Sequence, residues 1–329
     1  MKAAVLGTGS WGTALAQVLA DNGHEVILYG ISEEEVNDIN ENHRNSHFFP
    51  DPIHESLRAS TDLKCLQGAD VIIAAVPVKA MEDVLRKAQE EVTKPAIWIN
   101  VAKGFHPVSH RLLSDVMKEI LPAEKRRAVV SLIGPSHAEE VIKRLYTCVN
   151  AVSNDEEAAE TVQHLFSNRY FRVYRNTDVI GCEIGVALKN VMALASGMLE
   201  GIGQGDNARA ALMTRGLAEM TRFGVLCGGK KETYLGLDGV GDLIVTCTSR
   251  HSRNFMAGLA IGQDGGAERF LRENTRTTEG IAACKAVYEM AQKMGVEMPI
   301  TEQVYHVLYE QASPYEAAEA LMERKLKSE

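Results

Sequence analysis

The glycine pattern at the N-terminus constrains the fold of this chain more than any other feature. A short apolar run stops at Gly7, Gly9 and Gly12 follow, and residues 14–20 are rich in alanine and leucine. Between a strand and a helix, G-x-G-x-x-G is typical of a dinucleotide-binding βαβ unit. The first glycine permits a tight turn, the second lets backbone approach a pyrophosphate, and the third lets helix and strand pack closely. We therefore predict a dinucleotide site, against the alternative of a glycine-rich turn in an ordinary α/β domain.

Length, composition and charge exclude several classes of protein. A chain of 329 residues is long enough for about two domains, and its 45% hydrophobic and 24% charged residues are globular values. The formal net charge of −9 argues against a general nucleic-acid binder, and an anionic substrate would need a local cluster of cations. The most apolar later segment, 181–199, carries Glu183, Lys189 and Asn190, which argues against a membrane span. No stretch resembles a signal peptide.

The cysteines and histidines suggest neither disulfides nor a metal site. The six cysteines are widely scattered and no C-x-x-C occurs, which favours reduced thiols and a cytoplasmic protein. His43 and His47, like His106 and His110, are four residues apart, but no carboxylate completes a metal-binding motif. We interpret them as surface histidines and predict no metal.

The first part of the chain alternates strand-like and helix-like segments. The run at 71–76 is almost continuously apolar, as in a central strand buried on both faces. This order, with right-handed crossovers, predicts a doubly wound sheet with its ligand crevice at the carboxyl ends of the strands. We predict a dinucleotide-binding α/β domain at 1–180 and an all-helical substrate-binding domain at 181–329. The expected strands comprise residues 3–6, 25–29, 71–76, 97–101, 129–133, 148–152 and 170–174.

Two segments directly after predicted strands are candidates for chemistry. Lys103 follows the strand at 97–101, and Gly134 and Ser136 follow the strand at 129–133. Ser136 and Glu139 have the spacing of a capping box, which predicts a helix N-terminus opening into the crevice. The alternatives are an ordinary capped turn and a surface lysine.

One lysine stands out in the second part of the chain. The segment at 184–199 is apolar or small at nearly every position, which predicts a helix buried all round, and Lys189 and Asn190 are its strongly polar residues. Burying an ammonium group without a partner is costly, so we expect Lys189 to face a polar cavity where it can transfer protons. The alternative is a lysine that reaches solvent from the edge of the helix.

The segment at 239–254 carries a second polar group of residues. Asp242 lies where a helix can start, and Thr246 falls one turn later on the same face. Arg253 and Asn254 follow, and a guanidinium group with polar neighbours is suited to binding phosphate. The pattern alone is equally compatible with a solvated basic loop. The segment at 208–223 predicts another mostly buried helix.

These motifs resemble, nearly from end to end, the bacterial type of NAD(P)-dependent glycerol-3-phosphate dehydrogenase. The resemblance implies a Rossmann-like N-terminal domain, an all-helical C-terminal domain similar to that of 6-phosphogluconate dehydrogenase, and a homodimer. The motifs that carry it are GTGSWGTALA at 7–16, AKG at 102–104, GPSHAEE at 134–140, ALKN at 187–190, GDNARAALMTRGLAEM at 205–220, GVGDLIVTCTS at 239–249, HSRN at 251–254 and EMPITEQVY at 297–305.

The resemblance also implies roles for individual residues. Lys189 corresponds to the proton donor and acceptor, with Lys103 a second lysine near substrate and nicotinamide and Asp242 orienting the lysine or binding substrate. The substrate-binding set it implies is Lys103, Gly134, Ser136, Lys189, Asp242, Thr246, Ser252, Arg253 and Asn254, with Arg253 holding the phosphate. The cofactor-binding set is Gly7, Gly9, Ser10, Trp11, Gly12, Ile31, Lys103, Ala138, Arg253, Thr277 and Glu279.

The activity implied is reduction of dihydroxyacetone phosphate to sn-glycerol 3-phosphate for glycerophospholipid synthesis. Reduced nicotinamide passes a hydride to the ketone carbon, and Lys189 protonates the oxygen. A nearby Lys103 would lower a lysine pKa by repulsion and polarise the carbonyl. The alternatives are another hydroxyacid dehydrogenase of the 6-phosphogluconate-like group and a non-catalytic nucleotide-sensing protein.

The choice between NAD and NADP stays open at this level. NAD enzymes place Asp or Glu about 20 residues after the glycines, whereas NADP-preferring members of the family often carry His or Arg after the second strand. Here that place reads Gly30-Ile31-Ser32-Glu33. Ser32 is able to bond a 2′-phosphate, while Glu33 and Glu34 are able to repel it.

Overall fold

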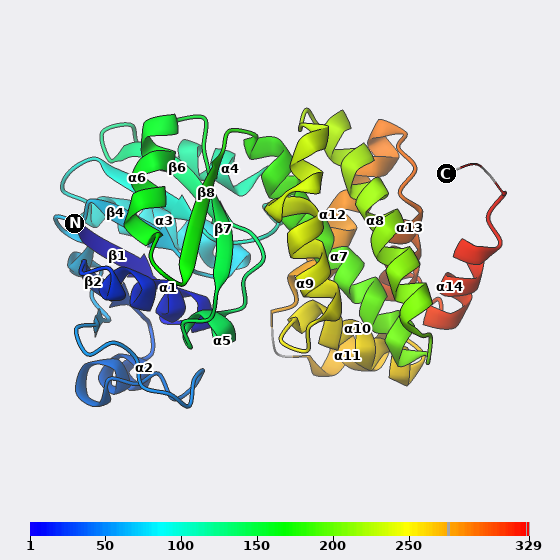
Figure 1. The fold of residues 1–329 in the computed structure, drawn as a ribbon, viewed down its shortest axis with the longest axis horizontal. Helices are drawn as coiled ribbons and strands as arrows, with labels where there is room; N and C mark the ends of the chain where they lie inside the picture. Colours follow the sequence, from blue (N-terminus) through cyan, green and yellow to red (C-terminus); the bar gives the residue numbers. More distant parts are fainter. Residues whose placement is uncertain (275–276, 327, 329) are drawn as a thin grey trace. The chain divides into compact units, whose positions relative to one another are not determined.

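The protein consists of two compact units in the computed structural model, which describes residues 1–274, 277–326 and 328. The first unit spans Met1–Val179 and contains the sheet, and the second spans Ile180–Glu329 and is helical. Figure 1 draws the first unit in blue to green and the second in green to red. The predicted α/β and all-helical architecture is confirmed.

Within the described part of the first unit, eight strands form one sheet with the order β3-β2-β1-β4-β5-β6-β7-β8. This order places β1 centrally and reverses direction between β1 and β4, as in a doubly wound fold. The sequence predicted every strand except the three-residue β3. The strands are β1 (Lys2–Leu6), β2 (Glu25–Tyr29), β3 (Arg58–Ser60), β4 (Val71–Ala74), β5 (Ala96–Asn100), β6 (Arg126–Ile133), β7 (Thr147–Val152) and β8 (Phe171–Asn176).

Strand β7 reverses the strand direction within the doubly wound sheet. It pairs antiparallel to β6, while every other neighbouring pair is parallel. The segment between β6 and β7 contains only the single-turn helix α5 (Ala138–Val141), and Arg144 adopts a left-handed conformation with φ of 59°. The chain therefore turns back, because a parallel connection needs a longer crossover element.

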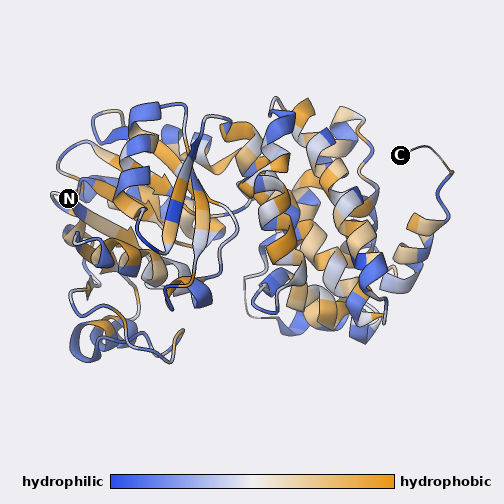
Figure 2. Cartoon of the chain, in the orientation of Figure 1, coloured by the Kyte–Doolittle hydropathy of each residue, from blue (hydrophilic) through white to orange (hydrophobic). Residues whose placement is uncertain are grey.

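Helices cover both faces of the sheet. Alternate residues of β1 enter opposite cores: Ala3 and Val5 pack with α1 (Ser10–Asp21) and α6 (Glu156–Phe166). Ala4 and Leu6 pack with α3 (Val78–Glu91) and α4 (Leu113–Ile120). Strands buried on both faces need apolar side chains throughout, and the central strands are correspondingly coloured as hydrophobic in Figure 2. The shorter elements of this unit are α2 (Glu33–Asn37), η1 (Asp38–Asn42) and η2 (Leu63–Leu66).

The second unit is built around α7 (Val179–Gly201). This helix is long and apolar enough to cross a membrane by composition alone, but 94% of its most apolar window is buried inside the protein. It is the core helix that the sequence at 184–199 predicts. The other elements of the unit are α8 (Asp206–Leu226), η3 (Lys231–Leu235), η4 (Leu237–Gly241), α9 (Asp242–Thr248), α10 (Arg253–Asp264), α11 (Glu268–Glu273), α12 (Glu279–Met294), α13 (Pro299–Tyr309) and α14 (Pro314–Met322).

The prediction that α8 is mostly buried is wrong. Ala210, Ala211 and Ala218 are exposed, and the buried residues lie along one side of the helix. Alanine carries little apolar area, so leaving it in water costs little while its helix propensity remains high. Glu219 on the buried side accepts hydrogen bonds from the backbone N–H groups of Ile300 and Thr301 at the start of α13.

Helices α7 and α10 contact each other through their backbones. A β-carbon on Gly197 would lie 2.0 Å from the carbonyl oxygen of Phe255, and one on Gly258 would lie 2.0 Å from that of Leu194. Gly262 faces Met198 O at 2.5 Å in the same way. Only glycine permits this approach, which fixes α10 against the C-terminal part of α7.

We predict that Gly258→Ala lowers the free energy of unfolding by at least about 2 kcal/mol, because the added methyl group forces the two backbones apart. Urea denaturation of the purified variant measures this change. Gly266→Ala is the matched control, since a β-carbon there meets nothing within 4 Å. Equal stability of the two variants would contradict the close contact.

Candidate active site

The glycine-rich loop joins β1 to α1 as its motif predicts. Gly7 has φ of +116°, and a β-carbon on it would lie 2.5 Å from Ala75 O. A β-carbon on Gly12 would lie 2.4 Å from Gly7 O, so strand and helix pack without room for a side chain. Gly9, the N-cap of α1, meets nothing within 4 Å. Backbone at Gly9 and the first amides of α1 are therefore shaped for close approach by an anion.

The other predicted cofactor residues near this loop occupy the same edge of the sheet. Ser10 and Trp11 begin α1, and the partly buried Trp11 packs against the core. Ile31 follows the carboxyl end of β2 with 90% of its surface exposed. An apolar side chain so exposed is free to contact a ligand there.

The structure brings Lys103 and Gly134 together. Lys103 Nζ donates a hydrogen bond to Gly134 O at 2.7 Å, which ties the loop after β5 to the loop after β6. Ser136 Oγ donates to the same carbonyl oxygen at 3.1 Å. Gly134 has φ of +140° and its β-carbon position lies 3.0 Å from Val149 Cα, so the residue must be glycine.

The predicted capping box at Ser136 and Glu139 is wrong. Helix α5 starts at Ala138, and its N-cap His137 does not cap the helix through its side chain. The helix begins too late for Ser136 to cap it, and the Ser136 hydroxyl bonds Gly134 O instead. Ala138 is 7% exposed at the first position of this short helix.

In the second unit, Lys189 is paired with a carboxylate in the core. Its Nζ donates to Asp242 Oδ1 at 2.9 Å and to Thr246 Oγ1 at 2.7 Å. The lysine is 5% exposed, Asp242 is 1% exposed and Thr246 is 3% exposed. The alternative of a lysine that reaches solvent from a helix edge is therefore excluded. A buried ammonium group is stable only with such a partner, because desolvation otherwise outweighs its other interactions.

Helix α9 brings the carboxylate and hydroxyl to the lysine. Asp242 is its first residue, and Thr246 follows one turn later, as predicted. Thr246 Oγ1 lies 2.6 Å from Asp242 O, which orients the threonine side chain. Ser196 on α7 donates to Cys247 O at 2.8 Å and docks α9 against the lysine's helix. Burial raises the pKa of the Cys247 thiol to about 12, so this neighbour stays a neutral packing group.

The residues Ser252, Arg253 and Asn254 lie at the N-terminus of α10. Ser252 is the N-cap and accepts from Phe255 N at 3.2 Å, while Asn254 Oδ1 accepts from Gly280 N at 2.9 Å. Ser252 and Asn254 are buried and Arg253 is exposed. The bond to Gly280 connects Arg253's helix to the start of α12, whose first residue is Glu279. Thr277 lies just before α12 and is half-buried.

Comparison with known proteins decides the family. Residues 2–159 match the model for the NAD-dependent glycerol-3-phosphate dehydrogenase N-terminus, and residues 178–319 match that for its C-terminus. This chain belongs to the glycerol-3-phosphate dehydrogenase family. The resemblance drawn from the motifs is confirmed.

Relatives and solved structures of the family match over the full chain. Glycerol-3-phosphate dehydrogenase [NAD(P)+] of Enterococcus faecalis is 50% identical, with 100% of this chain and 97% of the relative covered. The relative from Exiguobacterium sp. is 48% identical, with 99% of this chain and 96% of the relative covered. The crystal structure of glycerol-3-phosphate dehydrogenase from Coxiella burnetii has a TM-score of 0.90 at 37% identity and covers 98% of this chain and 99% of that one. The structure of the yeast glycerol-3-phosphate dehydrogenase GPD1 has a TM-score of 0.84 at 29% identity and covers 98% of this chain and 99% of that one.

Sequence reasoning missed two residues that hold the glycine-rich loop of this family member. Asn45 Nδ2 donates to Thr8 O at 2.7 Å, and Glu35 Oε2 accepts from Thr8 Oγ1 at 2.5 Å. Glu35 lies in the first turn of α2, where its backbone N–H donates to the N-cap Ser32 Oγ at 3.3 Å. Asn45 lies in an irregular segment whose sequence carries no signal for this contact.

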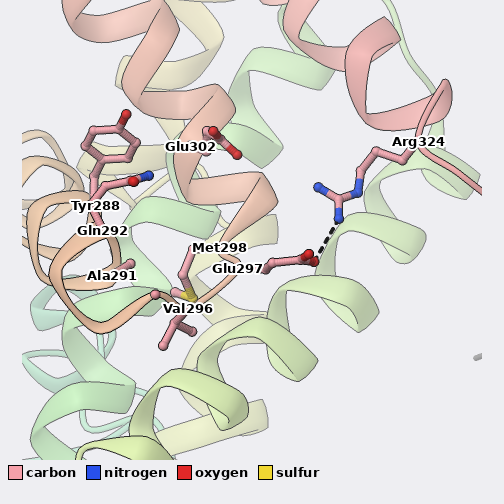
Figure 3. A pocket seen from close by; sticks show the side chains of 9 residues that line it. Tyr288, Ala291, Gln292, Val296, Glu297, Met298, Glu302 and Arg324 are labelled. Carbon is pink, nitrogen blue, oxygen red and sulfur yellow. Dashed lines mark hydrogen bonds and ion pairs between the residues drawn. The ribbon is translucent and has the colours of Figure 1, made fainter.

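A pocket in the second unit is lined by residues other than those predicted for the active site. It has a volume of about 290 Å³ and lies beside α12, the start of α13 and Arg324. Figure 3 shows Tyr288, Glu297 and Glu302 around it, and the ion pair between Arg324 and Glu297 at 3.1 Å. None of the predicted site residues lines it. Among the described residues no group of three or more potential metal ligands occurs.

We predict that Lys189→Met lowers the free energy of unfolding by about 3–5 kcal/mol, because it leaves the Asp242 carboxylate buried without its cation. The double variant Lys189→Met/Asp242→Leu should be less destabilised than the sum of the two single variants. Urea denaturation of all four proteins measures this coupling. Additive effects would show that the two side chains do not depend on each other.

Proposed function

We propose that this protein catalyses the reversible, NAD(P)H-dependent reduction of dihydroxyacetone phosphate to sn-glycerol 3-phosphate, which supplies glycerophospholipid synthesis. Relatives 46–50% identical across the chain are named glycerol-3-phosphate dehydrogenase [NAD(P)+]. The observation that carries the mechanism is the buried bond of Lys189 to Asp242 and Thr246.

The cofactor fits the glycine-rich loop. A β-carbon at Gly9 would project into space that is open in the structure, and the first amides of α1 lie beside it. The pyrophosphate would be held by Gly7, Gly9 and Gly12, with Ser10, Trp11 and Ile31 as neighbouring contacts. Bound as reduced nicotinamide, the cofactor supplies the hydride. Further proposed contacts are Lys103, Ala138, Arg253, Thr277 and Glu279.

Lys189 is the proposed proton donor. An ammonium group carries the proton needed by the oxygen of the former ketone, and general acid catalysis requires that group to be oriented. Asp242 Oδ1 and Thr246 Oγ1 hold Nζ from two sides at 2.9 and 2.7 Å, which restricts its position. The positive charge of Lys189 also stabilises negative charge that develops on the substrate oxygen. In the oxidation direction the neutral amine accepts the proton.

The remaining proposed residues bind the phosphorylated substrate. Arg253 is exposed at the start of α10, and a guanidinium group bonds phosphate oxygens in a bidentate manner. Ser252 and Asn254 hold Arg253's segment through their bonds to Phe255 N and Gly280 N. On the first unit, Lys103, Gly134 and Ser136 form one hydrogen-bonded group. A cation such as Lys103 there assists binding of an anion.

We predict that Lys189→Ala reduces kcat by at least about 100-fold, the usual contribution of general acid catalysis, while Kd for the cofactor changes little. Steady-state assays with dihydroxyacetone phosphate and fluorescence titration with NADH measure the two quantities. Lys293→Ala, at an exposed position on α12, is the control and should keep wild-type turnover. Near-normal kcat for Lys189→Ala would refute the assignment.

The proposal extends to a cytoplasmic homodimer. All six cysteines are free thiols, as expected in a reducing compartment, and the motif resemblance implies a dimer. We predict that light scattering coupled to gel filtration gives twice the chain mass. A single-chain mass at micromolar concentration would overturn the dimer and leave the catalytic assignment unchanged.

A further inference from the structure

Thr8, between the first two glycines of the loop, is held from several sides. Its carbonyl oxygen accepts from Asn45 Nδ2 at 2.7 Å and from Thr13 Oγ1 at 3.1 Å. Its hydroxyl donates to Glu35 Oε2 at 2.5 Å. Asn45 and Thr13 are fully buried, so these bonds belong to the rigid interior of the first unit. A carboxylate is thereby fixed against the glycine-rich loop.

This carboxylate lies at the carboxyl end of β2. Gly30 directly follows β2, and a β-carbon on it would lie 2.5 Å from the side chain of Thr8, which in turn bonds Glu35. In dinucleotide-binding folds this place holds either an acid, about 20 residues after the glycines, that bonds the adenosine ribose hydroxyls, or an Arg that takes a 2′-phosphate. Glu35 follows Gly12 at roughly that separation.

The surrounding charges disfavour a phosphate at the same place. Ile31, which follows the carboxyl end of β2, is apolar and 90% exposed. Ser32 Oγ accepts from Glu35 N, and Glu33 and Glu34 add two exposed carboxylates at the start of α2.

The cations of neighbouring segments bond elsewhere. Arg44 Nη1 donates to Pro50 O at 3.0 Å, and Arg58 Nη1 donates to Glu55 O and Leu57 O, both at 2.7 Å. Each of these guanidinium groups is directed at backbone carbonyl groups of its own segment. His43 ends η1 in a left-handed conformation and has a buried Nδ1.

We infer that Glu35 determines cofactor specificity and that this chain prefers NADH, with its free ribose 2′-hydroxyl, over NADPH. The inference rests on the proposed function, because it concerns the cofactor of that reaction. A carboxylate has two acceptor oxygens, so Glu35 bonds Thr8 and still accepts from a ribose hydroxyl. A 2′-phosphate carries nearly two negative charges, and the fixed carboxylate repels it.

Binding of the adenosine half of the cofactor tests the inference without turnover. Isothermal titration calorimetry with ADP-ribose and with 2′-phospho-ADP-ribose gives two Kd values for the full-length protein. We expect wild type to bind ADP-ribose at least about tenfold more tightly, a difference of about 1.4 kcal/mol. Equal or tighter binding of the 2′-phosphorylated probe would overturn the inference.

Two variants isolate the charge of Glu35. Glu35→Gln keeps an acceptor for Thr8 and removes the charge, so the ratio of the two Kd values should move toward one, with Glu33 and Glu34 still present. Ile31→Arg, at an exposed position that leaves the fold intact, should reverse the preference. Glu41→Gln removes an equal charge from an exposed position on η1 and should behave as wild type. An unchanged ratio in Glu35→Gln would remove Glu35 from the specificity role.

Kinetics separate this inference from the proposed function. The ratio of kcat/KM for NADH to kcat/KM for NADPH, with dihydroxyacetone phosphate, should follow the same order across the four proteins. Turnover with equal use of both cofactors would refute the inference and support the function. Normal probe selectivity without turnover on dihydroxyacetone phosphate would refute the function and leave the inference standing.

Discussion

The ion pair between Lys189 and Asp242 is the interaction on which the helical unit depends. An ammonium group in the middle of α7 would destabilise that core unless a carboxylate neutralised it. The carboxylate comes from α9, which the Lys189 bonds to Asp242 and Thr246 and the Ser196 bond to Cys247 hold against α7. A single arrangement therefore satisfies the packing of the core and orients Lys189, the proton donor proposed for the reaction. Because Lys189, Asp242 and Thr246 both stabilise the core and form the proposed catalytic group, a substitution at any of them is expected to affect both.

In the sheet unit the decisive constraint is steric, because the glycine-rich loop after β1 has no room for side chains at Gly7 and Gly12. Gly7 and Gly12 are needed because Ala75 and Gly7 carbonyl groups occupy the space of their side chains, while Gly9 leaves space for a ligand. Thr8 bears the polar contacts that keep this loop in place. The hydrogen bond from Lys103 to Gly134 likewise holds the loop after β5 against the loop after β6. Fixed backbone amides offer a phosphate group its bonds with little reorganisation.

Sequence reasoning succeeded where one local rule dominated. The glycine spacing predicted the β1–α1 turn, the apolar segment predicted the buried α7, and Asp242 with Thr246 predicted one face of α9. It failed where burial or contacts between distant segments decided the outcome. The alanines of α8 look like core residues but contribute too little area to require burial. Ser136 has capping-box spacing, yet its hydroxyl bonds Gly134 instead. No pattern shows that Asn45 reaches Thr8, because that contact exists only after the chain has folded.

The glycine contact between α7 and α10 has a consequence for how this molecule is able to diverge. The backbone of Gly197 contacts that of Phe255, and the backbone of Gly258 contacts that of Leu194. No side chain lies between the two helices at these positions that could repack to accommodate a change in their separation. These contacts fix the separation between α7, the helix of Lys189, and α10, the helix of Arg253. Substitutions elsewhere in the unit are able to alter stability gradually, whereas at these positions the choice is between glycine and loss of the arrangement. Evolutionary change in substrate preference would therefore have to proceed through the loops instead of through the separation of these two helices.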